Sequence, residues 1–116
     1  MSYDPQNIFA RIIAELIPCN KVYEDANTLA FYDIAPKAPV HILVVPKGPY
    51  MDFEDYVAHA PAQEISGFFQ TVSKLAQELG IAESGYRLIT NKGEHSGQEV
   101  PHFHVHLLGG APLPLW

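Results

Sequence analysis

Three histidines alternate with large apolar residues near the end of the chain, between His102 and Leu108. Successive side chains of a β-strand point to opposite faces, so this alternation predicts a strand with its histidines on one face and its apolar residues on the other. The histidines are His102, His104 and His106. The apolar side chains, those of Phe103, Val105 and Leu107, are expected to enter a core. Any fold of this chain must therefore contain a sheet that is apolar on one side of this strand and carries three imidazoles on the other.

The remaining apolar patterns predict two helices and four more strands. Ile8, Ile12, Ile13 and Leu16 recur at helical spacing after Asp4-Pro5, which suits an N-cap and first helical residue, and Pro18 ends this helix. A second apolar face of period 3.6 predicts the main helix over 62–79, followed by Gly80. The four strands are predicted at 21–24, 28–33, 41–45 and 86–91, with a hairpin loop at 25–27 and a glycine-containing loop at 92–99.

The order of these elements predicts the fold class. One helix, three strands, a second helix and two strands, joined by short links, indicate an α+β fold with a mainly antiparallel five-stranded sheet and two helices on one face. At 116 residues the chain is expected to form one domain over 1–116.

Charge and hydropathy exclude several classes of partner. Thirteen acidic and seven basic side chains give a net charge of −6, which repels nucleic acid. No apolar run approaches the roughly 18 residues of a membrane span, so no membrane partner is expected. The N-terminus does not resemble a secretion signal, and Cys19 is the only cysteine, so we expect a cytoplasmic protein.

Three kinds of role compete for the histidine face. The outer two histidines lie roughly 13 Å apart along a strand, whereas two nitrogens bound to one zinc lie no more than about 4.2 Å apart. All three histidines therefore cannot easily share one ion, and no metal is expected. A metal site made by two of them, spaced His-x-His, with His41 as the third ligand stays open as an alternative. A purely structural role also stays open, but burying three neighbouring imidazoles is costly without a use for them. Acid–base or nucleophilic chemistry is favoured.

At this point the chain resembles the histidine triad (HIT) superfamily. The three alternating histidines, Gly97-Gln98 before them and Gly109-Gly110 after them carry the resemblance. It extends to Ile8-Phe9, Ile17-Pro18, Val22–Asp25, Phe31–Ile34, Ala38–His41 and Tyr86–Leu88, and it is close to the Hint branch. The resemblance implies a HIT-like fold and a purine nucleoside phosphoramidase that needs no cofactor. Such an enzyme cleaves AMP- or GMP-like phosphoramidates through a nucleotidyl-histidine intermediate. Two alternatives stay open, a hydrolase of dinucleoside polyphosphates and a non-catalytic nucleotide-binding or interaction module.

The resemblance also implies a role for each site residue. The implied nucleophile is His104, and a backbone carbonyl of its own strand fixes the tautomer of its ring. The implied role of His102 and His106 is to contact phosphate oxygens and to orient this nucleophile. His41 is implied to join the same histidine cluster. An imidazole ring is largely unprotonated near pH 7, and in this form its free nitrogen can attack phosphorus, which agrees with the implied role of His104. The phosphate ligands implied are Asn91, Gly97 and Gln98, together with His104 and His106. The nucleoside ligands implied are Asp33 for the ribose and Ile8, Phe9, Ile12, Ile17, Phe31 and Ile34 for the base.

The chain departs from the family pattern at two positions, and the resemblance also implies a second subunit. Glu99 and Pro101 stand where the family often has serine and tyrosine, which affects the choice of leaving group. The resemblance implies a homodimer, in which Trp116 of the tail either packs at the subunit interface or forms an exposed end. His59 and His95, outside the motif, are expected to be solvent-exposed.

Overall fold

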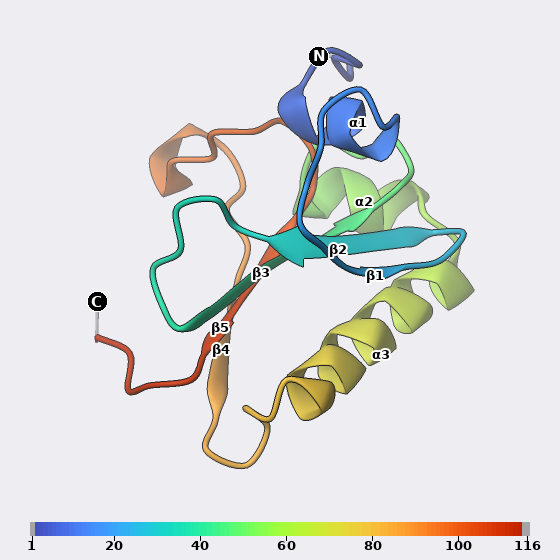
Figure 1. Cartoon of the computed structure of the whole chain (residues 1–116). Coiled ribbons are helices and arrows are strands. Elements are labelled where there is room, and N and C mark those ends of the chain that lie inside the picture. Colours follow the sequence, from blue (N-terminus) through green and yellow to red (C-terminus); the bar gives the residue numbers. More distant parts are fainter. Residues whose placement is uncertain (1, 115–116) are drawn as a thin grey trace.

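The centre of the protein is one antiparallel sheet of five strands in the order β1-β2-β3-β5-β4 (Figure 1). The structure is a computed structural model, and it describes residues 2–114. The strands are β1 (Lys21–Glu24), β2 (Thr28–Tyr32), β3 (Val40–Pro46), β4 (Tyr86–Ile89) and β5 (Val105–Gly109). Every neighbouring pair is antiparallel, and the predicted α+β fold is confirmed.

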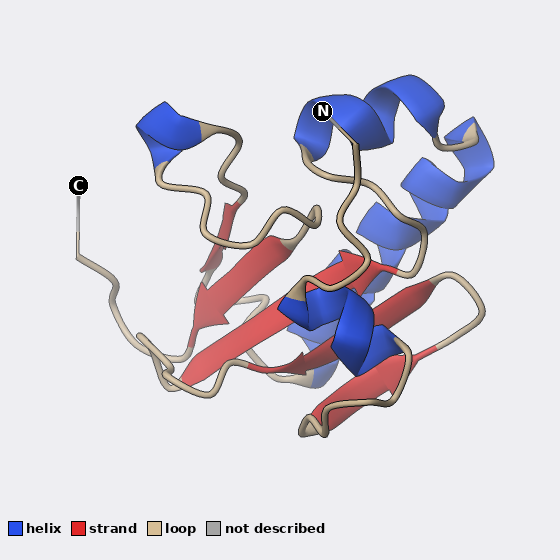
Figure 2. Ribbon diagram, turned by 90° about the horizontal axis from the view of Figure 1, so that it is seen from above, coloured by secondary structure: helices blue, strands red, loops and turns tan. Residues whose placement is uncertain are grey.

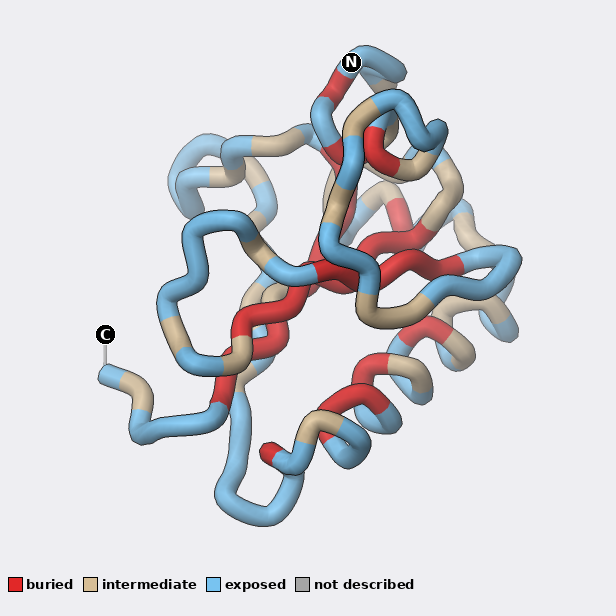
Figure 3. The backbone as a smooth tube through the Cα atoms, in the orientation of Figure 1, coloured by how far each residue is buried: buried red, intermediate tan, exposed pale blue. Residues whose placement is uncertain are grey.

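The middle strand β3 is buried on both faces. Ile42 and Val44 belong to one apolar cluster, and Leu43 and Val45 belong to the cluster on the other side of the sheet. Figure 3 shows this burial as a continuous band through the middle of the sheet. A strand covered on both sides needs apolar residues at consecutive positions, which explains why this segment does not alternate.

One face of the sheet packs against two helices. The long helix α3 (Ala62–Glu78) inserts Phe68, Val72 and Leu75 into the larger cluster and passes behind the strands in Figure 2. It ends one residue earlier than predicted, before Gly80 with φ +75°. The short helix α2 (Phe53–His59) was missed, because seven residues show too little periodicity. It is capped by Asp52, whose carboxylate accepts the N–H of Asp55 at 2.9 Å.

The other face packs against α1 (Ile8–Ile13), so the prediction that the helices share one face is wrong. Phe9 and Ile12 lie on the strand residues that point away from α3, and Figure 1 shows α1 and α3 on opposite sides of β2. The prediction failed because the apolar pattern of a helix shows which of its faces is buried but not which face of the sheet it covers.

The limits of α1 also differ from the prediction. Asn7 is the N-cap, since its side chain accepts the N–H of Ala10 at 2.9 Å, while Asp4 forms an earlier turn by accepting the N–H of Gln6. The helix ends at Ile13, before Glu15 adopts a positive φ of 64°, and not at Pro18. The side chain of Leu16, expected on the buried face, is therefore 72% exposed.

Strand β5 begins at Val105, three residues later than predicted. In the β3 register, Val105 pairs with Val44, so two residues further on Phe103 would lie opposite Pro46, which has no N–H to donate. The N–H of Phe103 donates to the carbonyl of Tyr50 at 2.7 Å instead. Alternation nevertheless continues through this segment, because Phe103 stacks on Tyr56 in the larger cluster while His102 faces Phe9 of α1.

Two other strands end before the predicted limits. Strand β2 ends at Tyr32 and β4 at Ile89, which leaves Asp33 and Asn91 in the loops that follow. The loop at 92–99 contains a short 3₁₀ turn, Glu94–Ser96. None of the helices within residues 2–114 has the length and apolar character needed to cross a membrane.

Candidate active site

The ring of His104 is held in one tautomer by the backbone carbonyl of His102. Its Nδ1 lies 2.7 Å from the carbonyl oxygen of His102, which can only accept a hydrogen bond, so Nδ1 carries the proton. Burial lowers the pKa of His104, against the opposing effects of this hydrogen bond and of Asp33. The neutral ring therefore keeps its lone pair on Nε2, which is the form a nucleophilic imidazole requires.

His102 is fully buried, and both of its ring nitrogens are occupied. Nε2 lies 2.8 Å from the carbonyl oxygen of Pro46 and donates to it. The hydroxyl of Tyr3 lies 2.6 Å from Nδ1 and donates to it. Burial lowers the pKa of His102 to about 4. Neither ring nitrogen is left for a phosphate oxygen, while the backbone carbonyl of the same residue accepts the hydrogen bond from His104. No signal in the sequence pointed to Tyr3, because 99 residues separate it from His102.

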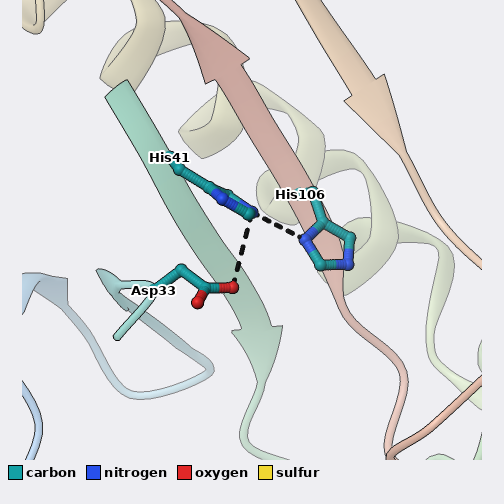
Figure 4. Close-up of side chains that lie close together, drawn as sticks. All are labelled: Asp33, His41 and His106. Atoms are coloured by element: carbon teal, nitrogen blue, oxygen red, sulfur yellow. Dashed lines mark hydrogen bonds and ion pairs between the residues drawn. The ribbon is translucent and has the colours of Figure 1, made fainter. Parts of the chain in front are cut away.

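A second pair of histidines forms across strands β3 and β5, as Figure 4 shows. The backbone N–H of Lys37 donates to Nδ1 of His41 at 3.1 Å, so the proton of the neutral His41 ring is on Nε2. That nitrogen lies 2.9 Å from Nδ1 of His106 and donates to it. His106 consequently carries its own proton on Nε2. Its ring centroid is 5.1 Å from that of His104, so a ring with a lone pair on Nε2 and a ring with an N–H on Nε2 are neighbours.

The charges around this pair act in opposite directions. Burial lowers the pKa of His106 to about 4, and neighbouring His104 and His41 add to this effect. Burial also lowers the pKa of His41. The Asp33 carboxylate opposes both shifts, and its Oδ2 lies 3.5 Å from Nε2 of His41. Both rings are therefore neutral near pH 7.

The same three side chains, Asp33, His41 and His106, offer ligand atoms within 4.8 Å of one another, as a metal site would. A metal ion needs a lone pair from each ligand. Nε2 of His41 carries a proton as long as Lys37 donates to Nδ1, so binding would require that hydrogen bond to break. The tautomers thus suit proton transfer better than metal ligation.

The predicted phosphate ligands Asn91, Gly97 and Gln98 lie together in the loop before the histidines, but their polar groups are engaged within it. Asn91 donates to the carbonyl of Ser96 at 3.0 Å, and the N–H of Gly97 donates to Glu94. The Gln98 amide donates to the carbonyls of Met51 and Val100. It accepts the N–H of Gly93 at 2.9 Å. These hydrogen bonds shape the loop, and a phosphate would have to replace them. Glu99 and Pro101 are exposed beside it.

The predicted nucleoside ligands divide into a buried and an exposed set. Phe9, Ile12 and Phe31 are buried and Ile17 packs against them, with the Phe9 ring 4.9 Å from that of His104. Ile8 is 44% exposed and Ile34 is 97% exposed. Ile12 and Ile17 line a cavity of about 230 Å³ that also includes Cys19. A groove of about 330 Å³ between β1 and α3 contains none of the predicted ligands. His59 and His95 are exposed, as expected.

Comparison with known proteins shows which family the chain resembles. The HIT domain family model matches residues 14–113. A 13.2 kDa HIT-like protein of Azospirillum brasilense is 52% identical over 112 residues, which are 97% of this chain and 92% of that protein. The purine nucleoside phosphoramidase of Escherichia coli K12 is 45% identical over 108 residues, covering 93% and 90% of the two chains.

Solved structures show the same fold. A HIT family hydrolase from Clostridium thermocellum is 40% identical, with a TM-score of 0.86 over 96% of both chains. A histidine triad protein from Clostridium difficile is 44% identical, with a TM-score of 0.84 over 94% of both chains. A family model over most of the chain, close relatives and a shared fold all agree, and the protein therefore belongs to the HIT family of histidine triad proteins.

Proposed function

We propose that the protein hydrolyses purine nucleoside phosphoramidates, with His104 as the nucleophile. The observation that carries this proposal is the 2.7 Å hydrogen bond from Nδ1 of His104 to the carbonyl of His102, which leaves the lone pair on Nε2. The name of the E. coli relative, purine nucleoside phosphoramidase, supports this substrate class over dinucleoside polyphosphates.

The first chemical step forms a bond between Nε2 of His104 and phosphorus while the P–N bond breaks. The electron pair of the P–N bond goes to the departing amine, which takes the Nε2 proton of a His106 ring that has first been protonated from solvent, so that this ring becomes neutral. Water then attacks phosphorus and gives a proton to Nε2 of His106, which releases the mononucleotide and frees His104. The two rings are close enough, at 5.1 Å between centroids, to serve one phosphoryl group.

The nucleoside is proposed to lie between the Asp33 carboxylate, which accepts the ribose hydroxyls, and the apolar residues around Phe9. The phosphate is proposed to dock on the loop of Asn91, Gly97 and Gln98 and to exchange for hydrogen bonds within it. An anion can replace such internal acceptors at little cost, because N–H groups bind charged acceptors more strongly than neutral ones. His102 acts by holding the carbonyl that orients His104.

The assembly is proposed to be a homodimer that uses the edge strand β4. This strand is at one end of the sheet order, and its residues Tyr86 and Leu88 are 38% and 44% exposed. An edge strand with exposed apolar side chains is a surface that proteins normally cover. Trp116, expected either at a subunit interface or as an exposed end, lies outside the described residues. Cys19 is unpaired, which fits the reducing cytoplasm as the site of action.

The test of the function uses His104→Ala, with His59→Ala as the matched control. The His59 side chain is 70% exposed on α2 and takes no part in the site. We expect His104→Ala to lower kcat/KM for an adenosine phosphoramidate by at least about 10³-fold, while His59→Ala stays near wild type. Mass spectrometry of quenched wild-type protein should show an adenylyl adduct on the peptide containing His104.

Three results would contradict the proposal, and two of them would favour a named alternative. Equal turnover by wild type and His104→Ala would exclude His104 as the nucleophile. Faster hydrolysis of a diadenosine polyphosphate than of the phosphoramidate would indicate a dinucleoside polyphosphate hydrolase. AMP binding with neither turnover nor an adduct would indicate a non-catalytic binding module.

A further inference from the structure

The carboxylate of Asp33 lies directly beside the hydrogen-bonded pair of His41 and His106 (Figure 4). The backbone N–H of Asp33 donates to the carbonyl of His41 at 3.0 Å, which ties the end of β2 to the start of β3. Oδ1 accepts the N–H of Ala35 at 2.8 Å, and this turns Oδ2 toward His41 at 3.5 Å. The Asp33 side chain is 19% exposed, so water screens its charge only in part.

The neutral pair shares one proton between two facing nitrogens. Nε2 of His41 and Nδ1 of His106 are 2.9 Å apart, and only one of them carries hydrogen. A proton added to the pair puts hydrogen on both nitrogens, and two N–H groups at this distance repel each other. His41 cannot relieve the repulsion by moving its proton to Nδ1, because the N–H of Lys37 already points at that atom. The acceptor within reach is Oδ2 of Asp33.

We propose that Asp33 is the counter-charge that lets the His41–His106 pair hold an added proton for the leaving amine. In the charged state the added proton is on Nδ1 of His106, and the N–H of His41 turns to Oδ2 of Asp33. Nε2 of His106 then gives its proton to the amine as the P–N bond breaks, and the pair becomes neutral again. This role rests on the proposed function and is separate from any contact of Asp33 with ribose.

The other groups that face the pair all oppose its protonation. Burial disfavours the charged form of both rings, and the Lys37 ammonium lowers the pKa of each. His104, on the other side of His106, lowers the pKa of that ring as well. Asp33 acts in the opposite direction on His41, on His106 and on His104. Removing its charge should therefore make the pair harder to protonate.

The first test measures protonation directly and needs no turnover. The ring nitrogens of His41 and His106 are followed by ¹⁵N NMR during an acid titration of wild type, Asp33→Asn and the control Glu83→Gln. The control removes one exposed carboxylate in the turn between α3 and β4. We expect the midpoint of the pair to fall by about one pH unit in Asp33→Asn and to stay unchanged in the control.

Asparagine keeps an oxygen for the N–H of Ala35, and Asp33→Ser provides a second variant that also keeps one. Equal midpoints in wild type and Asp33→Asn would overturn the counter-charge. A wild-type pair that stays neutral until the fold is lost would overturn it too.

The second test separates the counter-charge from ribose binding. Both substrates carry the 5′-phosphate of 2′,3′-dideoxyadenosine, which lacks the two ribose hydroxyls. In one substrate this phosphate is linked to an alkyl amine as a phosphoramidate. In the other it is linked to p-nitrophenol, which departs as p-nitrophenolate without taking a proton. We expect Asp33→Asn to lower kcat about tenfold or more for the amine and little for p-nitrophenolate. Equal effects on both, or none on either, would overturn the inference. If wild type does not cleave an adenosine phosphoramidate that keeps both ribose hydroxyls, the proposed function fails while the titration still decides the counter-charge. If wild type cleaves that compound but neither dideoxy compound, the titration alone decides.

Discussion

Acid should destabilise this protein through His102. Its ring is fully buried between the Pro46 carbonyl and the Tyr3 hydroxyl, and burial lowers its pKa from 6.5 to about 4. Protonation would put a second N–H against the Tyr3 hydroxyl, which would have to stop donating. The unfolded chain therefore binds this proton more readily than the folded protein between about pH 4 and 6.5.

The sign and size of the effect follow from this difference. Where the unfolded state binds more protons, stability rises with pH, so the free energy of unfolding must fall as the pH drops from about 6.5 to about 4. A change in pKa from 6.5 to about 4 corresponds to about 3 kcal/mol from His102 alone. For a chain of 116 residues, a loss of this size lowers Tm by more than about 10 °C.

The assay is urea denaturation over this pH range, for wild type and for His102→Gln. Glutamine retains an amide that can donate to the Pro46 carbonyl, and it does not titrate. The variant is expected to start from a lower stability near neutral pH and to lose about 3 kcal/mol less than wild type on acidification. Parallel loss of stability in the two proteins would refute the reasoning, because the other histidines would then account for all of it.

Two further predictions test neighbouring groups. Tyr3→Phe keeps the ring but leaves Nδ1 of His102 without its donor. The free energy of unfolding, measured by thermal or urea denaturation, should therefore fall by about 1 to 3 kcal/mol. An unchanged value would mean that water replaces the hydroxyl. Because Nε2 of His41 carries a proton, purified protein should hold no stoichiometric zinc by elemental analysis, and EDTA should leave turnover unchanged; zinc retained through dialysis would contradict this.

Local patterns were sufficient for most of the secondary structure. The long helix α3 and the five strands were predicted within a few residues, because each carries a run of apolar side chains at one period. The hairpin loop was predicted from its residue types, and the Asp25 carboxylate indeed accepts the N–H groups of Asn27 and Thr28 at 2.8 Å. Helix α2 is too short for such a signal.

The ends of the elements were less accurate, because they depend on competition between nearby groups. Asn7 replaces Asp4 as the cap of α1 because its side chain reaches the N–H of Ala10. Strand β5 starts late because Pro46 on the neighbouring strand offers no N–H. Neither competition is visible in the spacing of apolar residues.

The sequence by itself determined that His102, His104 and His106 lie on one side of a strand segment, because alternation is a property of the backbone. It also carried the resemblance that identifies the family. Only the tertiary structure decided how the three differ. A proton's place on an imidazole depends on which acceptor or donor lies opposite each nitrogen. For His104 this is the nearby carbonyl of His102. For His102 and His106 the partners come from Tyr3, Pro46 and His41, which are distant in the chain. The fold thus leaves a lone pair on Nε2 of His104 and an N–H on Nε2 of His106.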